Sequence, residues 1–313
     1  MRRDAKIYVA GHSGLVGKAI IPKLKAKGFG NIITRTHREL DLAQQEQVQK
    51  FFEAEKPQYV ILAAAKVGGI QANISYPADF IYENLAIQTN VIHSSYRFGV
   101  KKLLFFGSAC VYPRECPQPM KEEYLLSGYL EPTNEPYAVA KIAGIEMCQA
   151  YNRQYGTNFI CAIPTTIYGP NDSFDLDGSH VIPALMRKFH EAKTKKYATV
   201  EVWGTGNPRR EFIYVDDVAD ASLFLLDSYN GLEIVNLGLG GDVSVKELAY
   251  LIKEVVGYNG SVVFDASKPD GMLRKVLDVS RLRSLGWQAK VSLHEGLLKT
   301  YAWYLKHFTT NSG

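Results

Sequence analysis

Tyr137 and Lys141 have the residue types and the spacing that carbonyl reduction requires. They stand in YAVAK, so on a helix they lie at i and i+4 on one face. Asn134 and Pro136 just before them are helix-start signals, which place Tyr137 in the first turn near the positive end of the helix dipole. The dipole and the Lys141 ammonium should both lower the pKa of the phenol. A tyrosine tuned in this way can exchange a proton with a carbonyl oxygen while hydride moves to carbon.

Ser108 gives this pair its context, because YxxxK alone is common by chance and more often decorates a surface. Ser108 ends the strand-like run LLFFGS, and the Tyr137 helix begins after that strand. In a doubly wound sheet, ligands bind beyond the carboxyl ends of the strands. Ser108, Tyr137 and Lys141 should therefore converge at one catalytic site.

Short apolar runs alternate with helix-length segments over the first half of the chain. The runs are KIYVAG, NIITRT, QYVILAAA, KKLLFFGS and NFICAIPT, and the segments between them carry apolar residues at helical spacing. This order predicts an α/β fold, a Rossmann-type doubly wound parallel sheet, over residues 1–165. Loops rich in Gly, Pro, Asn and Asp follow, and they predict a smaller C-terminal substrate-binding lobe. That lobe should comprise mainly 166–313, with a segment of about 212–238 rejoining the first domain.

A glycine-rich turn, GHSGLVG, follows the first predicted strand and opens a helix. Gly11, Gly14 and Gly17 leave room for a pyrophosphate to approach the helix N-terminus, where backbone N–H groups are unpaired. Such a turn alone is weak evidence and is a plain loop about as often. Its position at the first strand–helix junction of a βαβ series favours a dinucleotide site.

The end of the second predicted strand indicates which dinucleotide binds. An NAD enzyme often has an acidic residue there to hold the ribose 2′-hydroxyl, but this chain reads TRTHRELDL, with Arg35, His37 and Arg38. Basic groups fit a 2′-phosphate, which a carboxylate would repel. We therefore expect NADP(H) rather than NAD, and solvated loop charges are the alternative explanation of these residues.

Composition limits the remaining possibilities. Hydrophobic residues make up 46% and charged residues 22% of the 313 residues, an ordinary globular composition that allows two lobes. A net charge of +4, with both signs interspersed, calls for no nucleic-acid surface. No stretch approaches the ~20 apolar residues that span a membrane. Cys110, Cys116, Cys148 and Cys161 lack metal-ligand spacing and disulfide density, so we expect free thiols, no metal site and a cytoplasmic protein.

The glycine turn, Ser108 and YxxxK together resemble the extended short-chain dehydrogenase/reductases, which epimerise, dehydrate or reduce nucleotide sugars. Within that class the chain is similar to the GDP-L-fucose synthases from about Lys6 to Tyr304, in LAAAKVGGI, YPADFIYEN, EPTNEPYAVAKIAG, SHVIPAL, WGTGNPRREF and FDASKPDG. The resemblance implies that GDP-4-keto-6-deoxy-D-mannose is epimerised at C3 and C5 and then reduced at C4 by NADPH. The residues fit this chemistry, because a site that polarises the C4 ketone acidifies the hydrogens at both C3 and C5.

Epimerisation also needs a base and an acid at carbon, and the resemblance assigns these roles to Cys110 and His180. The loop position of Cys110 and the nearby Lys141 favour a reactive thiol. Without the resemblance, Cys110 would be a small buried hydrophobe and His180 a structural histidine. Ser108 and Tyr137 would stabilise the enolate oxygen. The same resemblance implies substrate contacts from Lys188, Trp203, Arg210, Asp270 and Lys275.

A set of cofactor contacts is also implied by the resemblance. Asp41 and Leu42 should border the adenine, and the segment 164–167 should border the nicotinamide. Ser13 and His37 replace basic residues found in bacterial relatives, for which Arg38 or Arg35 can compensate. The full set is Gly11, His12, Ser13, Gly14, Leu15, Val16, Gly17, His37, Arg38, Asp41, Leu42, Phe106, Gly107, Ser108, Lys141, Pro164, Thr165, Thr166, Ile167 and His180.

Two other functions compete with a reductase–epimerase. One is a 4-epimerase of the UDP-glucose type with tightly held NAD, and the other is a protein that senses dinucleotide, although a sensor would usually lack the intact Ser, Tyr and Lys set. A sugar 4,6-dehydratase would carry an acidic pair where Ala109 and Cys110 stand. Apolar residues on the helices around 84–98 and 137–155 predict a homodimer, and lining the monomer core is their simpler explanation.

Overall fold

Six parallel strands form the central sheet, in the order β10-β5-β4-β3-β1-β2. The computed structural model describes residues 1–175, 179–268 and 270–309. The chain leaves β1 towards β2 on one side and towards β3 on the other, so a topological switch point lies at β1, where ligands of such sheets bind. The strands span Ile7–Ala10 (β1), Ile32–Ile33 (β2), Tyr59–Leu62 (β3), Lys102–Phe106 (β4), Phe159–Pro164 (β5) and Val235–Leu237 (β10).

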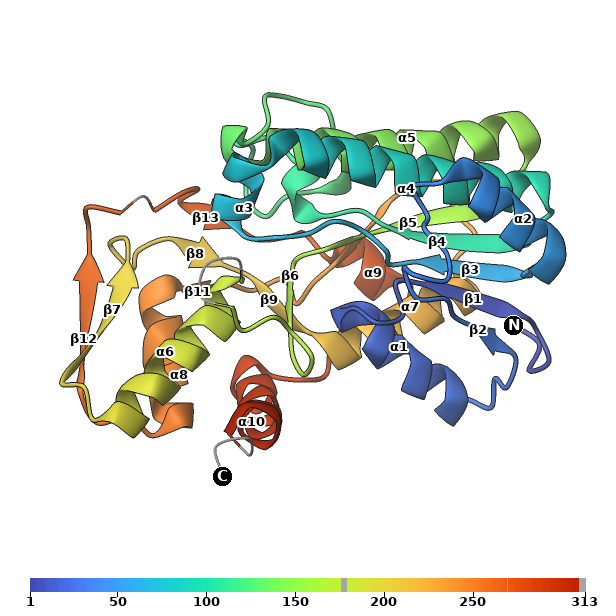
Figure 1. Ribbon diagram of the computed structural model, residues 1–313. Helices are drawn as coiled ribbons and strands as arrows, with labels where there is room; N and C mark the ends of the chain where they lie inside the picture. The colour runs from blue at the N-terminus through green and yellow to red at the C-terminus, as the bar shows by residue number, and fades with distance from the viewer. Residues whose placement is uncertain (176–178, 269, 310–313) are drawn as a thin grey trace.

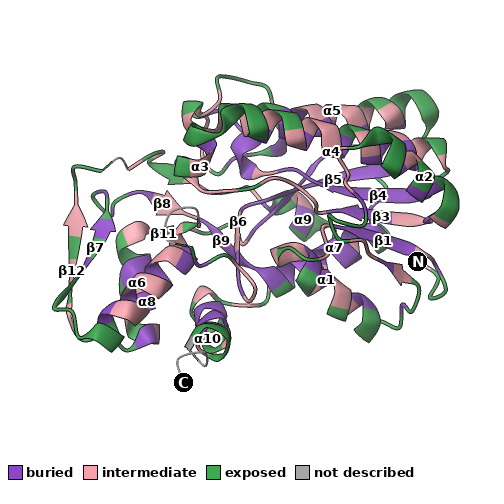
Figure 2. Ribbon diagram, in the orientation of Figure 1, coloured by how far each residue is buried: buried purple, intermediate pink, exposed green. Residues whose placement is uncertain are grey.

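Helices cover both faces of this sheet (Figure 1). One face carries α2 (Gln45–Glu55), α4 (Pro77–Arg97) and α5 (Glu135–Tyr155), and the other carries α1 (Leu15–Ala26) and α7 (Val215–Ser228). Each face of the sheet has its own hydrophobic core. Alternate strand residues point to opposite faces, so Tyr8 packs in the first core, while Ile7 and Val9 pack in the second core on the other face. Apart from Lys102 in β4 and Asn236 in β10, the strands are therefore apolar, and they are largely buried (Figure 2), as a two-sided parallel sheet requires.

A smaller lobe continues beyond the carboxyl ends of the strands, on the left of Figure 1. Helices α6 (Val181–Lys195), α8 (Val245–Val256) and α10 (Leu293–Tyr304) share a third core with the parallel pair β7 (Thr199–Trp203) and β12 (Ser261–Asp265). Helix α8 begins with a capping box in which Ser244 and Glu247 satisfy each other's backbone N–H groups. Two further small sheets are present. One has three strands in the order β11 (Val243–Ser244), β8 (Arg209–Arg210) and β13 (Arg274–Lys275), and the other pairs β6 (Thr166–Tyr168) with β9 (Phe212–Tyr214).

The remaining elements are short. Helices α3 (Ile70–Ser75) and α9 (Ser280–Ser284) and the 3-10 helices η1 (Ala109–Val111), η2 (Glu122–Tyr124) and η3 (Pro132–Asn134) lie in connections, and the π-helical η4 (Leu305–Thr309) follows α10. In the described part of the chain, no helix is both long and apolar enough to cross a membrane.

The predicted α/β fold with a doubly wound parallel sheet is confirmed. The five predicted strands and the crossover helices are present, although NIITRT supplies a strand of only two residues. The sequence predicts that residues around 212–238 rejoin the first domain as a helix. Helix α7 packs against the sheet in the second core. Strand β10 pairs with β5 as a sixth strand, which the sequence pattern did not predict.

Candidate active site

Strand β4 and helix α5 bring three of the predicted catalytic residues together. Strand β4 ends at Phe106, and Gly107 follows where an added Cβ would lie 2.5 Å from the Ile163 Cδ1 atom. Ser108 is extended and its Oγ caps η1 by accepting from the Cys110 N–H at 3.5 Å. Helix α5 begins at Glu135, so Tyr137 stands in its first turn as predicted. The Ser108 hydroxyl interacts with the Tyr137 phenol.

Lys141 lies below this group and is buried. Its Nζ donates to the Phe106 carbonyl at 3.0 Å and lies 4.9 Å from the ring centroid of Phe105. The same Nζ is 5.8 Å from the ring centroid of Tyr137. Burial lowers the pKa of Lys141 to about 8, so its ammonium is held close to the point of losing a proton.

The pKa of Tyr137 differs in direction from the prediction. Burial raises the pKa of the phenol well above its usual value, Cys110 adds to the increase, and the Ser108 hydroxyl opposes it. The expected lowering by the helix dipole and Lys141 was wrong for this state, because desolvation of a phenolate outweighs them. Tyr137 is therefore a neutral proton donor, which is the form that carbonyl reduction consumes.

Cys110 is also buried, and the sequence did not predict which cation acts most strongly on its thiol. Burial raises the pKa of the Cys110 thiol, and Lys275 opposes this increase more strongly than Ser108 or Lys141 does. We expected Lys141 to be the activating cation, but β13 brings Lys275 from the smaller lobe to the thiol. The spacing of the residues gave no signal for this pairing. It depends on how the two lobes fold against each other.

His180 stands at the N-cap of α6, as the sequence predicted, and its side chain makes no capping bond. The imidazole is open to solvent, yet the surrounding chain shields it enough that burial lowers its pKa. Within the described residues, no hydrogen bond links His180 to the other catalytic candidates. The structure thus groups Ser108, Cys110, Tyr137 and Lys141, and places His180 on the smaller lobe.

The glycine turn fits the pyrophosphate of a dinucleotide. Gly11 has φ +84°, and a Cβ there would lie 2.5 Å from the Ala64 N atom, so only glycine fits. A Cβ at Gly17 would lie 2.2 Å from the Gly11 carbonyl oxygen. Helix α1 has no side-chain cap, and the buried Nδ1 of His12 has no partner among the described residues. These groups are suited to accepting an anion at the helix N-terminus.

Of the three basic residues after β2, Arg35 is held by other side chains, whereas His37 and Arg38 are available to a ligand. Arg35 donates to Glu55 at 2.5 Å and lies 5.4 Å from the Phe51 ring centroid, so its guanidinium is already engaged. His37 and Arg38 are exposed and have no hydrogen-bond partner in the described chain. Arg38 is therefore the strongest candidate for a 2′-phosphate contact, and Arg35 is not free to compensate.

We predict that Arg38→Ala lowers the preference for NADPH over NADH by about 10- to 100-fold, because a charge-assisted hydrogen bond to the 2′-phosphate is lost. The comparison is kcat/KM for the two cofactors, and the value with NADH should not change. Arg153→Ala removes an exposed arginine from the far end of α5 and serves as the control. An unchanged preference in Arg38→Ala would assign the 2′-phosphate to another group.

The other predicted cofactor residues follow the carboxyl ends of the strands. Ser13, Gly14, Leu15 and Val16 form the turn and the start of α1. The carboxylate of Asp41 accepts from the Ala43 N–H at 3.0 Å, which orders the segment beside α2. Leu42 packs against the core that contains Tyr8. Strand β4 ends at Phe106 and is followed by Gly107, β5 ends at Pro164 and is followed by Thr165, and Thr166 and Ile167 begin β6.

Lys188 and Trp203 lie together on the smaller lobe. The Lys188 Nζ donates to the Glu201 carbonyl at 3.3 Å and lies 5.4 Å from the Trp203 ring centroid. Lys268 lies 5.5 Å from the same centroid. Trp203 is nonetheless 59% exposed, so a flat group can still reach the indole.

Arg210, Asp270 and Lys275 come from adjacent segments. Arg210 donates to the Asp270 carbonyl at 3.3 Å, and the Asp270 carboxylate accepts from the N–H and hydroxyl of Thr205, each at 2.7 Å. Asp270 therefore holds a neighbouring loop. Burial lowers the pKa of both Arg210 and Lys275, because removing their charges from water costs free energy. A bound anion beside them would offset this desolvation cost.

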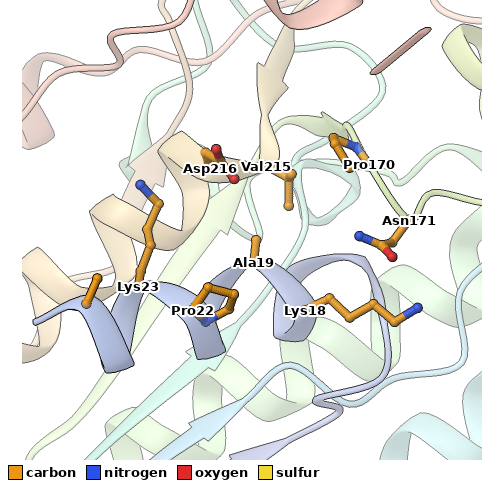
Figure 3. Close-up of a pocket in the computed structure, with 9 residues that line it drawn as sticks. Lys18, Ala19, Pro22, Lys23, Pro170, Asn171, Val215 and Asp216 are labelled. Atoms are coloured by element: carbon orange, nitrogen blue, oxygen red, sulfur yellow. The ribbon is translucent and has the colours of Figure 1, made fainter. Parts of the chain in front are cut away.

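A separate cavity of about 320 Å³ lies between α1, α7 and the turn after β6 (Figure 3). Lys18, Lys23 and Asp216 contribute charged groups to its walls, alongside Pro22 and Pro170. None of the predicted site residues lines it. This cavity is therefore distinct from the group around Tyr137.

Known proteins are similar to this chain over nearly its whole length. The sequence profile described as the NAD dependent epimerase/dehydratase family matches residues 7–238. The chain belongs to this epimerase/dehydratase family. It is 61% identical to GDP-L-fucose synthase 1 of Arabidopsis thaliana over 305 residues, 97% of this chain and 94% of the relative.

Two solved structures are similar to this chain over nearly its whole length. A GDP-6-OMe-4-keto-L-xylo-heptose reductase from C. jejuni has a TM-score of 0.93 at 42% identity, covering 98% of this chain and 99% of its own. A GDP-L-fucose synthetase from Naegleria fowleri bound to NADP has a TM-score of 0.91 at 29% identity, covering 99% and 97%. The fold is thus shared with enzymes named for GDP-linked sugars.

Proposed function

We propose that this chain converts GDP-4-keto-6-deoxy-D-mannose to GDP-L-fucose by epimerising C3 and C5 and then reducing the C4 ketone with NADPH. The observation that carries the proposal is the grouping of Cys110 with Ser108 and Tyr137, which puts a base for carbon beside the donors for a carbonyl oxygen. The relatives named as GDP-L-fucose synthases support the same substrate, and the bound NADP of the Naegleria fowleri protein supports NADP(H).

Epimerisation precedes reduction in this mechanism. Ser108 and Tyr137 donate to the C4 oxygen, which acidifies the C3 and C5 hydrogens and stabilises the enolate. Cys110 removes each proton, and Lys275 lowers the cost of the thiolate that does so. His180 returns a proton on the other face. Its lowered pKa makes the imidazolium a strong acid, and its exposure allows reprotonation from solvent.

Reduction uses the same carbonyl site. NADPH, when bound along the glycine turn, supplies the hydride for C4. Tyr137 gives its phenolic proton to the C4 oxygen, and Lys141, with a pKa of about 8, lies beside the resulting phenolate to stabilise it. Lys141 is buried and Tyr137 is half-buried, which limits the access of water to this proton transfer.

A stoichiometric assay of NADPH consumption with the GDP-keto sugar tests the proposal. The expected result is oxidation of NADPH in an amount equal to the sugar converted. A 4-epimerase with tightly held NAD would change the sugar without net oxidation, and a dinucleotide sensor would leave the sugar unchanged. Either of those results would overturn the proposal.

We also propose that the chain is divided into a cofactor-binding domain and a substrate-binding lobe. Residues 1–165, joined by about 212–238, would form the NADP(H)-binding domain, and 166–313 would mainly form the substrate-binding lobe. The position of β10 in the main sheet supports this division.

We infer a cytoplasmic homodimer in which α4 and α5 pair with their copies. The stacked rings of Tyr96 and Tyr155 and the exposed side chains of Tyr82 and Val139 support that face. A monomeric mass in solution would exclude it.

A further inference from the structure

Glu211 lies at the junction of the two lobes, between β8 and β9, and is only 1% exposed. Its Oε1 accepts from the N–H groups of Leu239 and Gly240 at 2.7 and 2.6 Å. Its Oε2 accepts from the Leu277 N–H at 2.8 Å. One buried carboxylate therefore satisfies three backbone donors from two separate segments.

The backbone of Glu211 extends this set of contacts. Its N–H donates to the Lys275 carbonyl at 3.2 Å, and its carbonyl accepts from the Thr165 hydroxyl at 3.1 Å. A Cβ on Gly238 would lie 2.4 Å from the Glu211 Oε1 atom, so only glycine lets the loop after β10 approach so closely. Glu211 thus ties the end of β5, the loop after β10 and strand β13 to one point.

Two predicted substrate cations are positioned from that point. Arg210 directly precedes Glu211, and Lys275 shares a backbone hydrogen bond with it. Lys275 is also the strongest cation acting on Cys110. We propose that Glu211 is a positioning residue that fixes Lys275 and Arg210 relative to Cys110 and the end of β5. This inference rests on the proposed function for its substrate and names a group outside the predicted site.

The number of donors explains why a carboxylate is needed. A glutamine in its place has one acceptor oxygen and an amide nitrogen that cannot accept from an N–H. The less costly orientation keeps the oxygen on Leu239 and Gly240 and turns the amide towards the Leu277 N–H. Glu211→Gln should therefore release Leu277, in the segment that follows β13, and so loosen the position of Lys275 two residues earlier. Glu211→Asp keeps both oxygens and shortens the reach, so it should disturb the strand less.

The test compares Glu211→Gln with the full-length wild type. We expect kcat/KM for the GDP-keto sugar to fall about 10²-fold, the factor that misplacement by about 1 Å can cost, with the loss expressed mainly as a higher KM because the two cations contact the substrate. The Kd of NADPH should not change, because the glycine turn is elsewhere. Alkylation of Cys110 by iodoacetamide, followed by peptide mass, should slow, because the thiol loses the Lys275 ammonium that favours its ionised form. Glu211→Asp should give intermediate values.

Glu122→Gln is the matched control. Glu122 is another buried glutamate near β10, and its Oε1 accepts a single backbone N–H, from Asn236 at 3.0 Å, which a glutamine can still satisfy. KM and Cys110 alkylation should be unchanged in this variant. Wild-type KM and alkylation in Glu211→Gln would overturn the inference, and Glu211→Asp decides it if the glutamine variant does not fold. Failure of the wild type to convert the sugar would instead reject the proposed function, while the alkylation rates would still test Glu211.

Discussion

Tyr137→Phe is expected to lower the rate of NADPH oxidation with the GDP-keto sugar by about 10²- to 10⁴-fold, the usual cost of losing a general acid. The ring can keep its place, because it packs edge-on against Phe80 with centroids 6.2 Å apart. Only the hydroxyl that interacts with Ser108 and donates to the C4 oxygen is removed. The Kd of NADPH should therefore stay at the wild-type value. Single-turnover reduction and NADPH titration measure the two quantities separately.

Tyr155→Phe provides the control for this substitution. Tyr155 is the last residue of the same helix and is 45% exposed, so loss of its hydroxyl should not change either quantity. Near-wild-type reduction by Tyr137→Phe would show that another group protonates the carbonyl. Loss of NADPH binding in that variant would show that the ring, rather than the hydroxyl, has the larger role.

Cys110→Ser is expected to abolish most proton exchange at C3 and C5 while leaving the reducing groups in place. A serine hydroxyl is a far weaker base than a thiol, and loss of a general base costs about 10²- to 10⁴-fold. With substrate in D₂O, the variant should consume NADPH slowly and yield mainly unepimerised GDP-6-deoxyhexose with little deuterium at either carbon. Burial of Cys110 makes its thiolate depend on Lys275, so the serine cannot substitute at any accessible pH.

Cys116→Ser distinguishes this role from a general effect of thiol loss. Cys116 is half-buried near the same ammonium, and Lys275 also opposes the burial-driven increase in its pKa. Its replacement should leave deuterium incorporation unchanged. Wild-type incorporation at both carbons by Cys110→Ser would mean that the base is elsewhere and that Cys110 is a packed core thiol.

Much of the sheet domain could be predicted because its signals are local. Strands such as β1 and β5 are continuous apolar runs, and a two-sided parallel sheet needs such runs. Once these strands were ordered, the position of Ser108 after β4 and of Tyr137 at the start of α5 followed from topology. The glycine turn was also predictable, because its residues follow one another directly in the sequence. In the structure, close backbone contacts leave no room for a side chain at Gly11 or Gly17.

The features that were missed depend on contacts between distant segments. Strands β8 and β13 have two residues each and exist because they pair with each other. No sequence period reveals such pairs, so neither the approach of Lys275 to Cys110 nor the role of Glu211 could be predicted. The directions of the pKa shifts at Tyr137 and Cys110 were inaccessible too. They are set by desolvation, and spacing on a helix does not report burial.

In the proposed reaction, one site epimerises both carbons and then reduces the ketone. NMR of the product formed by the wild-type enzyme from GDP-4-keto-6-deoxy-D-mannose and NADPH in D₂O tests this sequence of steps. We expect GDP-L-fucose with deuterium at both C3 and C5, since each inversion takes its new proton from a solvent-exchangeable acid, and with hydride from NADPH at C4. A reduced GDP-6-deoxyhexose with the original configuration and no deuterium at C3 or C5 would contradict it.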